Sequence, residues 1–167
     1  DRILAEVSPA NLRSQVQALQ DFQTRYTSTA GCEAAGQYIY NYFSGLGLKV
    51  KFQDVPFTGG VSRNVVAELT GRADPGDVLI LCSHYDSYSN QSLTFAPGAD
   101  DNASGTAAVM EAGRVLSRYP LDFTVRFAAF TAEEIGLFGS KVYAQDARSR
   151  GDNIIGVINL DMIAYAD

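Results

Sequence analysis

Apolar residues in the first third of the chain recur at the spacing of helices. Ser8 followed by Pro9 is typical of a helix N-cap with proline in the first turn, and apolar residues at helical spacing follow as far as Leu19. A second helical pattern covers residues 32–46 and ends in a stretch that contains glycine. We therefore predict two helices before the first strand.

The pattern then changes to the two-residue alternation of β-strands. Residues 48–55 alternate apolar and polar side chains, which is typical of a half-buried strand, and residues 63–69 predict a second strand. We expect the two to form an antiparallel hairpin or meander at the edge of a sheet. The Gly, Asp and Pro content of residues 71–77 predicts a turn.

The second half of the chain alternates buried strands with helices. Strands are predicted over residues 78–82, 123–130 and 153–160, and helices over residues 104–119 and 137–148. This alternation favours a mostly parallel, covered sheet. The predicted fold class is therefore α/β, with a mostly parallel central sheet, an antiparallel edge and helices on both faces.

The composition is that of an ordinary globular protein. Of the 167 residues, 46% are hydrophobic and 19% are charged, so we predict a single domain over residues 1–167. The formal net charge of −6 argues against nucleic acid as a partner. A membrane span needs roughly 18 consecutive apolar residues, and no stretch of this sequence approaches that length.

Two cysteines do not make a disulfide framework. Cys82 lies within an apolar run and is expected to be a small buried core residue, whereas Cys32 lies at a predicted helix start, and their pairing stays open. The chain begins at Asp1 without a methionine or signal peptide, which favours a processed mature protein or a cut piece. We expect a secreted or periplasmic protein.

Four polar clusters fall beside the predicted strand ends or at the start of a helix. They are His84-Tyr85-Asp86-Ser87, Asp100-Asp101-Asn102, Glu133-Glu134 and Asp161. The carboxyl ends of parallel strands share one edge of the sheet, and ligands bind there. Carboxylates that gather at one place repel one another unless a cation neutralises them, and one His with several Asp and Glu suits zinc or a similar divalent ion.

Each cluster has an ordinary structural explanation when it is taken alone. A single His near a strand end is more often structural than a ligand, and Asp-Asp-Asn before a helix is more often a loop with an N-cap. A Glu-Glu pair is usually solvated, and an Asp after a strand is often a turn residue. The convergence of all four clusters on one predicted edge favours a metal site.

The strings around these residues are more specific than their spacing. They are His84-Tyr85-Asp86-Ser87, Pro97-Gly98-Ala99-Asp100-Asp101-Asn102-Ala103-Ser104-Gly105, Ala132-Glu133-Glu134-Ile135-Gly136-Leu137-Phe138-Gly139-Ser140 and Asn159-Leu160-Asp161-Met162-Ile163. In this order they resemble the co-catalytic zinc exopeptidases, the family of bacterial secreted leucyl aminopeptidases, glutamate carboxypeptidase II and the transferrin receptor. The resemblance covers nearly the whole chain.

The resemblance implies a set of zinc ligands. His84 and Asp161 would hold one zinc ion, Glu134 would bind the other, and Asp101 would bridge both. Family members often have a cis peptide bond after the bridging aspartate, which here is the bond between Asp101 and Asn102. Zinc is thus the expected cofactor, with two ions in a complete site.

The resemblance also implies a reaction. A hydroxide generated between the two zinc ions would attack the scissile carbonyl, with Glu133 as general base and then general acid. Asp86 would accept a hydrogen bond from His84 and fix its tautomer. The expected partner is a peptide with a free N-terminus, whose amine is held near the second metal.

The sequence departs from the family pattern in one respect. It contains one histidine, whereas the family has a second His ligand for the Glu134 metal downstream of the Asp161 motif. We therefore expect a fragment of a longer enzyme, with its C-terminal part missing and weak or no activity alone. Two alternatives stay open: a shortened, non-catalytic binding module, and a single-zinc acyltransferase that resembles glutaminyl cyclases. Asn102 and the Glu133-Glu134 pair favour a peptidase.

Overall fold

A computed structural model describes residues 2–165 and shows an α/β fold, as the sequence predicts. Its single five-stranded sheet has the order β1-β2-β4-β3-β5. The strands are β1 (Lys49–Phe57), β2 (Gly60–Leu69), β3 (Asp74–His84), β4 (Phe123–Phe130) and β5 (Asn153–Asn159). The helices are α1 (Pro9–Gln20), α2 (Ala30–Gly45), α3 (Gly105–Leu116) and α4 (Phe138–Arg150), with short helical turns at Leu4–Glu6 and Ala99–Ser104.

The sheet is mixed in the way that the sequence predicts. Strands β3, β4 and β5 are parallel neighbours, with β3 between the other two. Strand β2 pairs antiparallel with β4 and with β1, so the hairpin forms the edge of the sheet. The carboxyl ends of β3, β4 and β5 therefore lie at one edge, which is the condition on which the predicted site depends.

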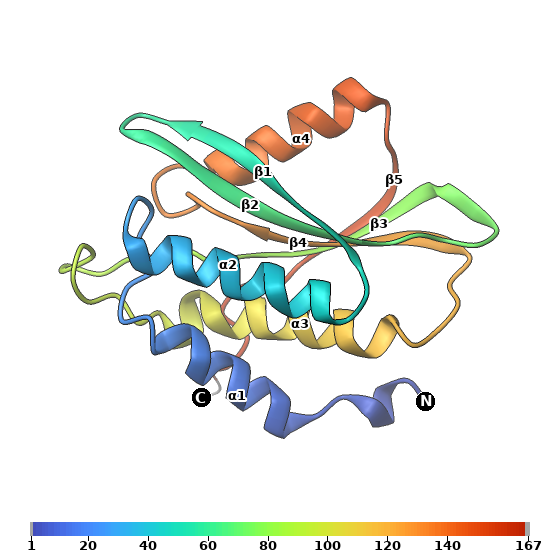
Figure 1. Cartoon of the computed structure of the whole chain (residues 1–167), viewed down its shortest axis with the longest axis horizontal. Coiled ribbons are helices and arrows are strands. Elements are labelled where there is room, and N and C mark those ends of the chain that lie inside the picture. The colour runs from blue at the N-terminus through green and yellow to red at the C-terminus, as the bar shows by residue number, and fades with distance from the viewer. Residues whose placement is uncertain (1, 166–167) are drawn as a thin grey trace.

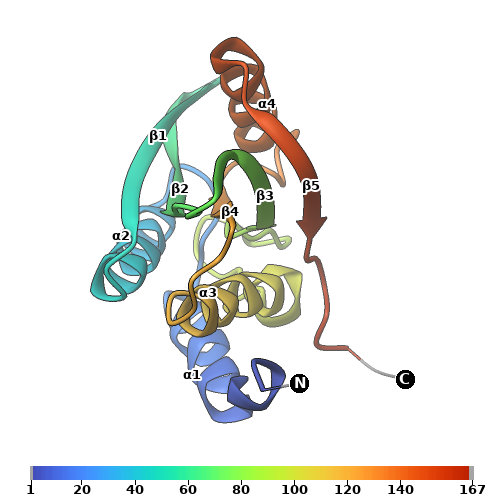
Figure 2. The same cartoon turned by 90° about the vertical axis from the view of Figure 1, so that its right-hand side faces the viewer.

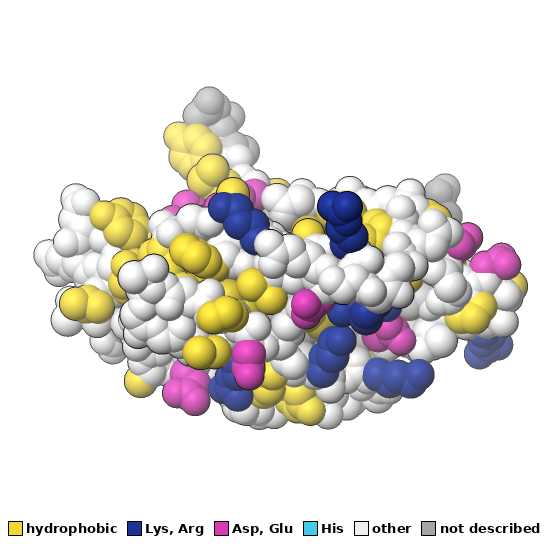
Figure 3. All heavy atoms as spheres, turned by 90° about the horizontal axis from the view of Figure 1, so that it is seen from above, with side chains coloured by type: hydrophobic (Ala, Val, Ile, Leu, Met, Phe, Trp, Pro, Cys, Tyr) yellow, Lys and Arg dark blue, Asp and Glu magenta, His cyan; other side chains and the backbone are white. Residues whose placement is uncertain are grey.

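Helices cover both faces of the sheet, although unequally. Helices α1, α2 and α3 lie on one face and α4 on the other (Figures 1 and 2). The larger core cluster contains Phe43, Met110 and Phe127, and the smaller one contains Ile80, Cys82 and Tyr143. On the face seen from the α4 side, acidic and basic side chains are interspersed among apolar ones (Figure 3). Among the described residues, no helix is long and apolar enough to cross a bilayer.

The structure corrects several predicted bounds. Strand β2 begins at Gly60 and helix α2 at Ala30, each earlier than predicted. The turn predicted over residues 71–77 is wrong in its second half, because Asp74 already pairs with Phe123 and an irregularity in register before Val78 accommodates the Pro-Gly pair. The helix predicted over residues 104–119 ends at Leu116. The N–H groups of the last two predicted residues bond to carbonyls three residues back, so the chain tightens into a turn before Pro120.

Strand β5 also differs from its prediction as a buried strand. It forms the second edge of the sheet, and its apolar residues Ile155 and Val157 are 51% and 58% exposed. An apolar run predicts a strand whose side chains tend to be buried, but it does not reveal whether another segment packs against them.

The structure also decides the cysteine pairing that the sequence left open. Cys32 and Cys82 are buried, are not bonded to each other and lie in different core clusters.

Candidate metal centre

Backbone topology carries the predicted site residues to one edge of the sheet. His84 is the last residue of β3, Glu133 and Glu134 follow β4, and Asp161 follows β5. Asp101 lies in the turn of π-helix before α3, where its φ of −101° and ψ of 99° interrupt the helical geometry. The peptide bond between Asp101 and Asn102 is cis, as the resemblance implies.

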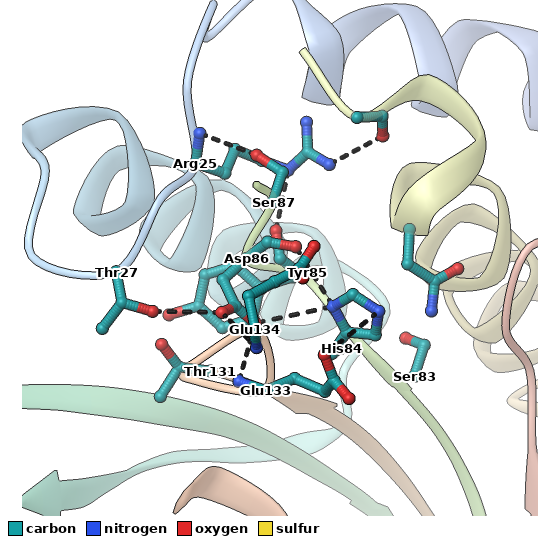
Figure 4. A network of polar contacts seen from close by, with 12 residues as sticks. Arg25, Thr27, Ser83, His84, Tyr85, Asp86, Ser87, Thr131, Glu133 and Glu134 are labelled. Atoms are coloured by element: carbon teal, nitrogen blue, oxygen red, sulfur yellow. Dashed lines mark hydrogen bonds and ion pairs between the residues drawn. The ribbon is translucent and has the colours of Figure 1, made fainter. Parts of the chain in front are cut away.

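The imidazole of His84 is the centre of the cluster. Its Nε2 atom lies 3.1 Å from Asp101 Oδ1, 3.6 Å from Asp161 Oδ1 and 4.0 Å from Glu133 Oε2. The ring itself is buried, with 5% of its surface exposed, whereas the side chains of Asp101 and Asp161 are 48% and 40% exposed. The arrangement is a buried nitrogen ligand facing carboxylates that solvent can reach. The close-up shows His84 beside Asp86 and Glu133 (Figure 4).

Two groups of ligand atoms are close enough to hold a metal ion. His84, Asp101 and Asp161 form one group, and His84, Glu133 and Glu134 form the other, with the atoms of each group within 4.8 Å of one another. One imidazole nitrogen and several carboxylate oxygens are a donor set that zinc accepts. The chemistry and spacing of these side chains therefore fit zinc.

The electrostatics of the cluster show the repulsion that a cation would relieve. Burial, with Asp101 and Asp86 next in importance, raises the pKa of Glu134 from 4.5 to about 7. Burial likewise raises the pKa of Glu133, and Asp86 adds to it. For His84, burial lowers the pKa, but Asp86, Glu133 and Asp161 together raise it to about 9. Without metal, His84 is protonated and Glu134 is partly protonated at neutral pH, and a metal ion would displace these protons.

Asp86 lies beneath the site and is fully buried. Its backbone carbonyl is 3.1 Å from Nδ1 of His84, and its carboxylate Oδ1 is 3.5 Å from the same atom. Both groups favour a proton on Nδ1, which leaves Nε2 free to face the carboxylate cluster. The predicted contact is thus shared, with the backbone carbonyl closer than the side chain.

The carboxylate of Asp86 has a further set of contacts that the sequence did not predict. It accepts hydrogen bonds from the backbone N–H groups of Glu133 and Glu134, at 3.1 and 3.2 Å, and from the hydroxyl of Thr27 at 3.0 Å. One buried side chain therefore holds the segment after β4 against the segment after β3. Only the folded chain brings these segments together.

An apolar cavity adjoins the cluster between α4 and β5. It has a volume of about 320 Å³ and reaches His84, Glu133 and Asp161, with walls formed by residues such as Tyr143 and Val157. The cluster is consequently open to solvent on one side and bordered by apolar side chains on another.

Comparison with known proteins places the chain in a family. The profile of Peptidase family M28 matches residues 64–167, which is more than half of the chain. The chain belongs to this peptidase family. A protein of Pyrenophora teres f. teres, named as a probable zinc metalloprotease, is 35% identical over 181 residues that cover 95% of this chain and 37% of that protein. The uncharacterized protein YfbL of Escherichia coli is 41% identical over 138 residues, covering 80% of this chain and 42% of YfbL.

Several solved structures share the fold of this chain. LapB of Legionella pneumophila superposes with a TM-score of 0.86 at 27% identity, covering 98% of this chain and 45% of LapB. An aminopeptidase of an Aneurinibacillus strain has a TM-score of 0.83 at 20% identity, with 96% and 71% coverage. A glutaminyl cyclase of Bacteroides thetaiotaomicron has a TM-score of 0.81 at 22% identity, with 95% and 63% coverage, so the fold alone does not separate the two activities. The chain spans well under half the length of the curated relatives cited here.

Proposed function

We propose that this chain carries a zinc site for hydrolysis of the N-terminal peptide bond of peptides. The observation that carries the proposal is the convergence of His84 with Asp101, Asp161, Glu133 and Glu134 at one sheet edge, in a chain of peptidase family M28. The name of the Pyrenophora relative supports zinc-dependent proteolysis. The two-ion arrangement and the role of each residue are part of the proposal.

In this proposal the ligands are divided between two zinc positions. His84, Asp101 and Asp161 would hold one ion, and Asp101 and Glu134 would contribute to the second. Zinc bound at these positions would lower the pKa of a water molecule and polarise the scissile carbonyl. Asp86 holds His84 in the tautomer that presents Nε2 to the site and fixes the backbone on which Glu134 is carried.

Glu133 moves the proton. Its side chain is 32% exposed and faces the cluster 4.0 Å from His84 Nε2, so it reaches both the buried ligand and the open side of the site. Its raised pKa brings the carboxyl closer to neutrality, where a group that must first take and then release a proton is most effective. Glu133 accepts the proton of the attacking water and returns it to the leaving amine.

The second zinc position also suits the substrate. The free N-terminal amine of a peptide would be held there, beside Asp101 and Glu134. An amine held beside these groups positions the first peptide bond, and no other, near Glu133. This is the basis on which we propose an exopeptidase.

The number of protein ligands sets the expected activity of the 167-residue chain. Because His84 is the one histidine of the sequence, the second zinc position has Asp101 and Glu134 alone, whereas catalytic zinc usually has three protein ligands. We propose that another part of a longer polypeptide, or a second copy of the chain, provides the third ligand. The chain alone then binds one zinc better than two and turns over slowly or not at all.

The test measures zinc content and turnover of a leucyl-arylamide on the 167-residue chain and on the full product of its gene. We expect two zinc ions and hydrolysis in the full product, and a loss of about 10²–10⁴-fold in turnover for Glu133→Gln with zinc retained. Asp122→Asn is the control, because this exposed carboxylate lies at the opposite end of β4.

Two outcomes would contradict the proposal. A full product that holds both ions without hydrolysing the arylamide would favour the non-catalytic binding module. Cyclisation of an N-terminal glutaminyl peptide, with no hydrolysis, would favour the acyltransferase, which shares the fold.

A further inference from the structure

Arg25 is among the largest fully buried side chains in the described part of the chain. It lies in the loop between α1 and α2 and is completely buried. Its Nε donates to the carbonyl of Tyr85 at 2.7 Å, its Nη1 to the carbonyls of Leu19 at 3.0 Å and Pro97 at 2.6 Å, and its Nη2 to that of Gly98 at 2.9 Å. All four acceptors are backbone carbonyls.

Three of these carbonyls belong to the segments that carry proposed zinc ligands. Tyr85 directly follows His84, and Pro97 and Gly98 lead into Asp101. The planar guanidinium therefore connects the segment after β3 to the segment before α3, and both arms are visible in the close-up (Figure 4). Packing is tight here: a Cβ on Gly98 would lie 3.0 Å from Arg25 Nη2 and 2.3 Å from the carbonyl oxygen of Asp101.

The backbone around Arg25 extends the same connection to the third segment. The N–H of Arg25 donates to the hydroxyl of Ser87 at 3.1 Å, and the N–H of Ser87 donates to the carbonyl of Arg25 at 3.3 Å. Two residues on, the hydroxyl of Thr27 donates to Asp86, whose carboxylate holds the N–H groups of Glu133 and Glu134. The loop at residues 24–27 thus contacts every segment of the site except the one after β5.

The burial of the positively charged Arg25 side chain is energetically unfavourable unless other interactions compensate for it. Taking a charge out of water costs several kcal/mol, and a buried apolar side chain would often stabilise a fold as well or better. Burial lowers the pKa of Arg25 to about 10, against which Cys32, Asp86, Asp101 and Glu134 raise it, so the group is charged at neutral pH. The charge is thus kept beneath a set of carboxylates that repel one another.

We infer that Arg25 is a positioning residue of the zinc site, which fixes the distance between the His84 and Asp101 segments through its backbone contacts and offsets part of the carboxylate repulsion. The inference rests on the zinc site of the proposed function. Lysine cannot replace it, because one ammonium group cannot reach carbonyls that surround a planar fork. Thr27 supports the same arrangement through Asp86.

The experiment compares Arg25→Lys, Thr27→Val and a control, Arg126→Lys. Arg126 is a second largely buried arginine, but it pairs with Glu68 and Asp152 away from the site. Zinc affinity is measured by competition with a chromophoric chelator, the ligand geometry by the visible spectrum of the Co²⁺ form, and stability by urea unfolding. These measurements do not depend on peptidase activity.

We expect at least a tenfold loss of zinc affinity and an altered Co²⁺ spectrum in Arg25→Lys, and a smaller loss in Thr27→Val. Arg126→Lys should lower the urea midpoint without changing either metal signal. A folded Arg25→Lys protein with unchanged zinc affinity and Co²⁺ spectrum overturns the inference and leaves the proposed function standing. If Arg25→Lys does not fold, an unchanged affinity in Thr27→Val overturns it instead. A wild-type chain without zinc affinity overturns both.

Discussion

At the scale of the residue, the candidate site depends on a small number of buried polar side chains with several partners each. Asp86 contacts His84 and also holds the backbone of Glu133 and Glu134. An orphaned N–H group at such a buried position would cost about 1–3 kcal/mol, so these contacts hold the segments firmly. The backbone that carries the Glu133 and Glu134 side chains is positioned by this buried carboxylate.

The raised pKa values of the cluster predict how the metal-free protein responds to pH. A group whose pKa is higher in the folded state contributes stability that is complete below its unfolded pKa and is lost as the pH rises through its folded pKa. For Glu134 that window runs from 4.5 to about 7, and for His84 from 6.5 to about 9. The metal-free protein should therefore lose stability between pH 5 and pH 9.

Urea unfolding in the presence of a chelator tests this expectation. Glu134→Gln, which stays neutral, should lose less stability than the wild type between pH 5 and pH 8, by about 1–3 kcal/mol after an allowance for solvent screening. Zinc should reverse the trend, because it binds the deprotonated ligands. An identical pH dependence in wild type and variant would show that Glu134 does not titrate in this range.

At the scale of the element, close approach between α4 and β4 sets the position of the Glu133-Glu134 segment. A Cβ on Gly139 would lie 2.2 Å from the carbonyl oxygen of Thr131 and 2.4 Å from Asn64 Oδ1. Asn64 in turn donates to the carbonyl of Gly139 and accepts from the N–H of Thr131. The helix begins against the end of the strand because glycine stands at this point.

Gly139→Ala should therefore destabilise the protein by about 1–3 kcal/mol, since the added methyl meets backbone that cannot move freely. The control is Gly45→Ala at the end of α2, where a Cβ would meet nothing within 4 Å. That change should be neutral or should stabilise by up to about 1 kcal/mol, because alanine favours helix. Thermal and urea unfolding measure both, and equal midpoints in the two variants would contradict the packing argument.

At the scale of the whole molecule, the sheet ends on two very different edges. The β1 edge belongs to a hairpin whose apolar face packs on α2, whereas β5 presents apolar side chains that the described part of the chain leaves about half exposed. An exposed apolar edge strand is a template for pairing with another chain. The isolated 167-residue chain therefore has a surface suited to self-association through β5.

Light scattering after size-exclusion chromatography tests this property. The apparent mass of the 167-residue chain should rise with concentration, and Ile155→Lys combined with Val157→Lys should hold it at the mass of a monomer. Leu4→Lys is the control. Leu4 is also exposed, at 72%, but it lies in the first helical turn and does not belong to β5. A wild-type chain that stays monomeric at every concentration would contradict the expectation.

The sequence by itself determined the elements and the chemistry that follows their ends. Apolar periodicity is a local property, so it located the strands that became β3, β4 and β5 and the helices between them. Parallel strands end at the same edge of a sheet, so the sequence alone predicted that His84 lies near Asp101 and Asp161, as the structure shows. The motif strings indicated the family to which the chain belongs.

Tertiary structure alone decided what supports that chemistry. Arg25 meets Tyr85 and Gly98 across 60 and 73 residues of sequence, and a polar loop after a helix is ordinarily solvated, so nothing local marks it as buried. The exposure of β5 depends on which strand stands last in the sheet, and that order is set by packing between segments distant in sequence. The periodicity of apolar residues shows which side chains of a segment tend to be buried. Contacts between segments distant in sequence determine which other segment packs against them.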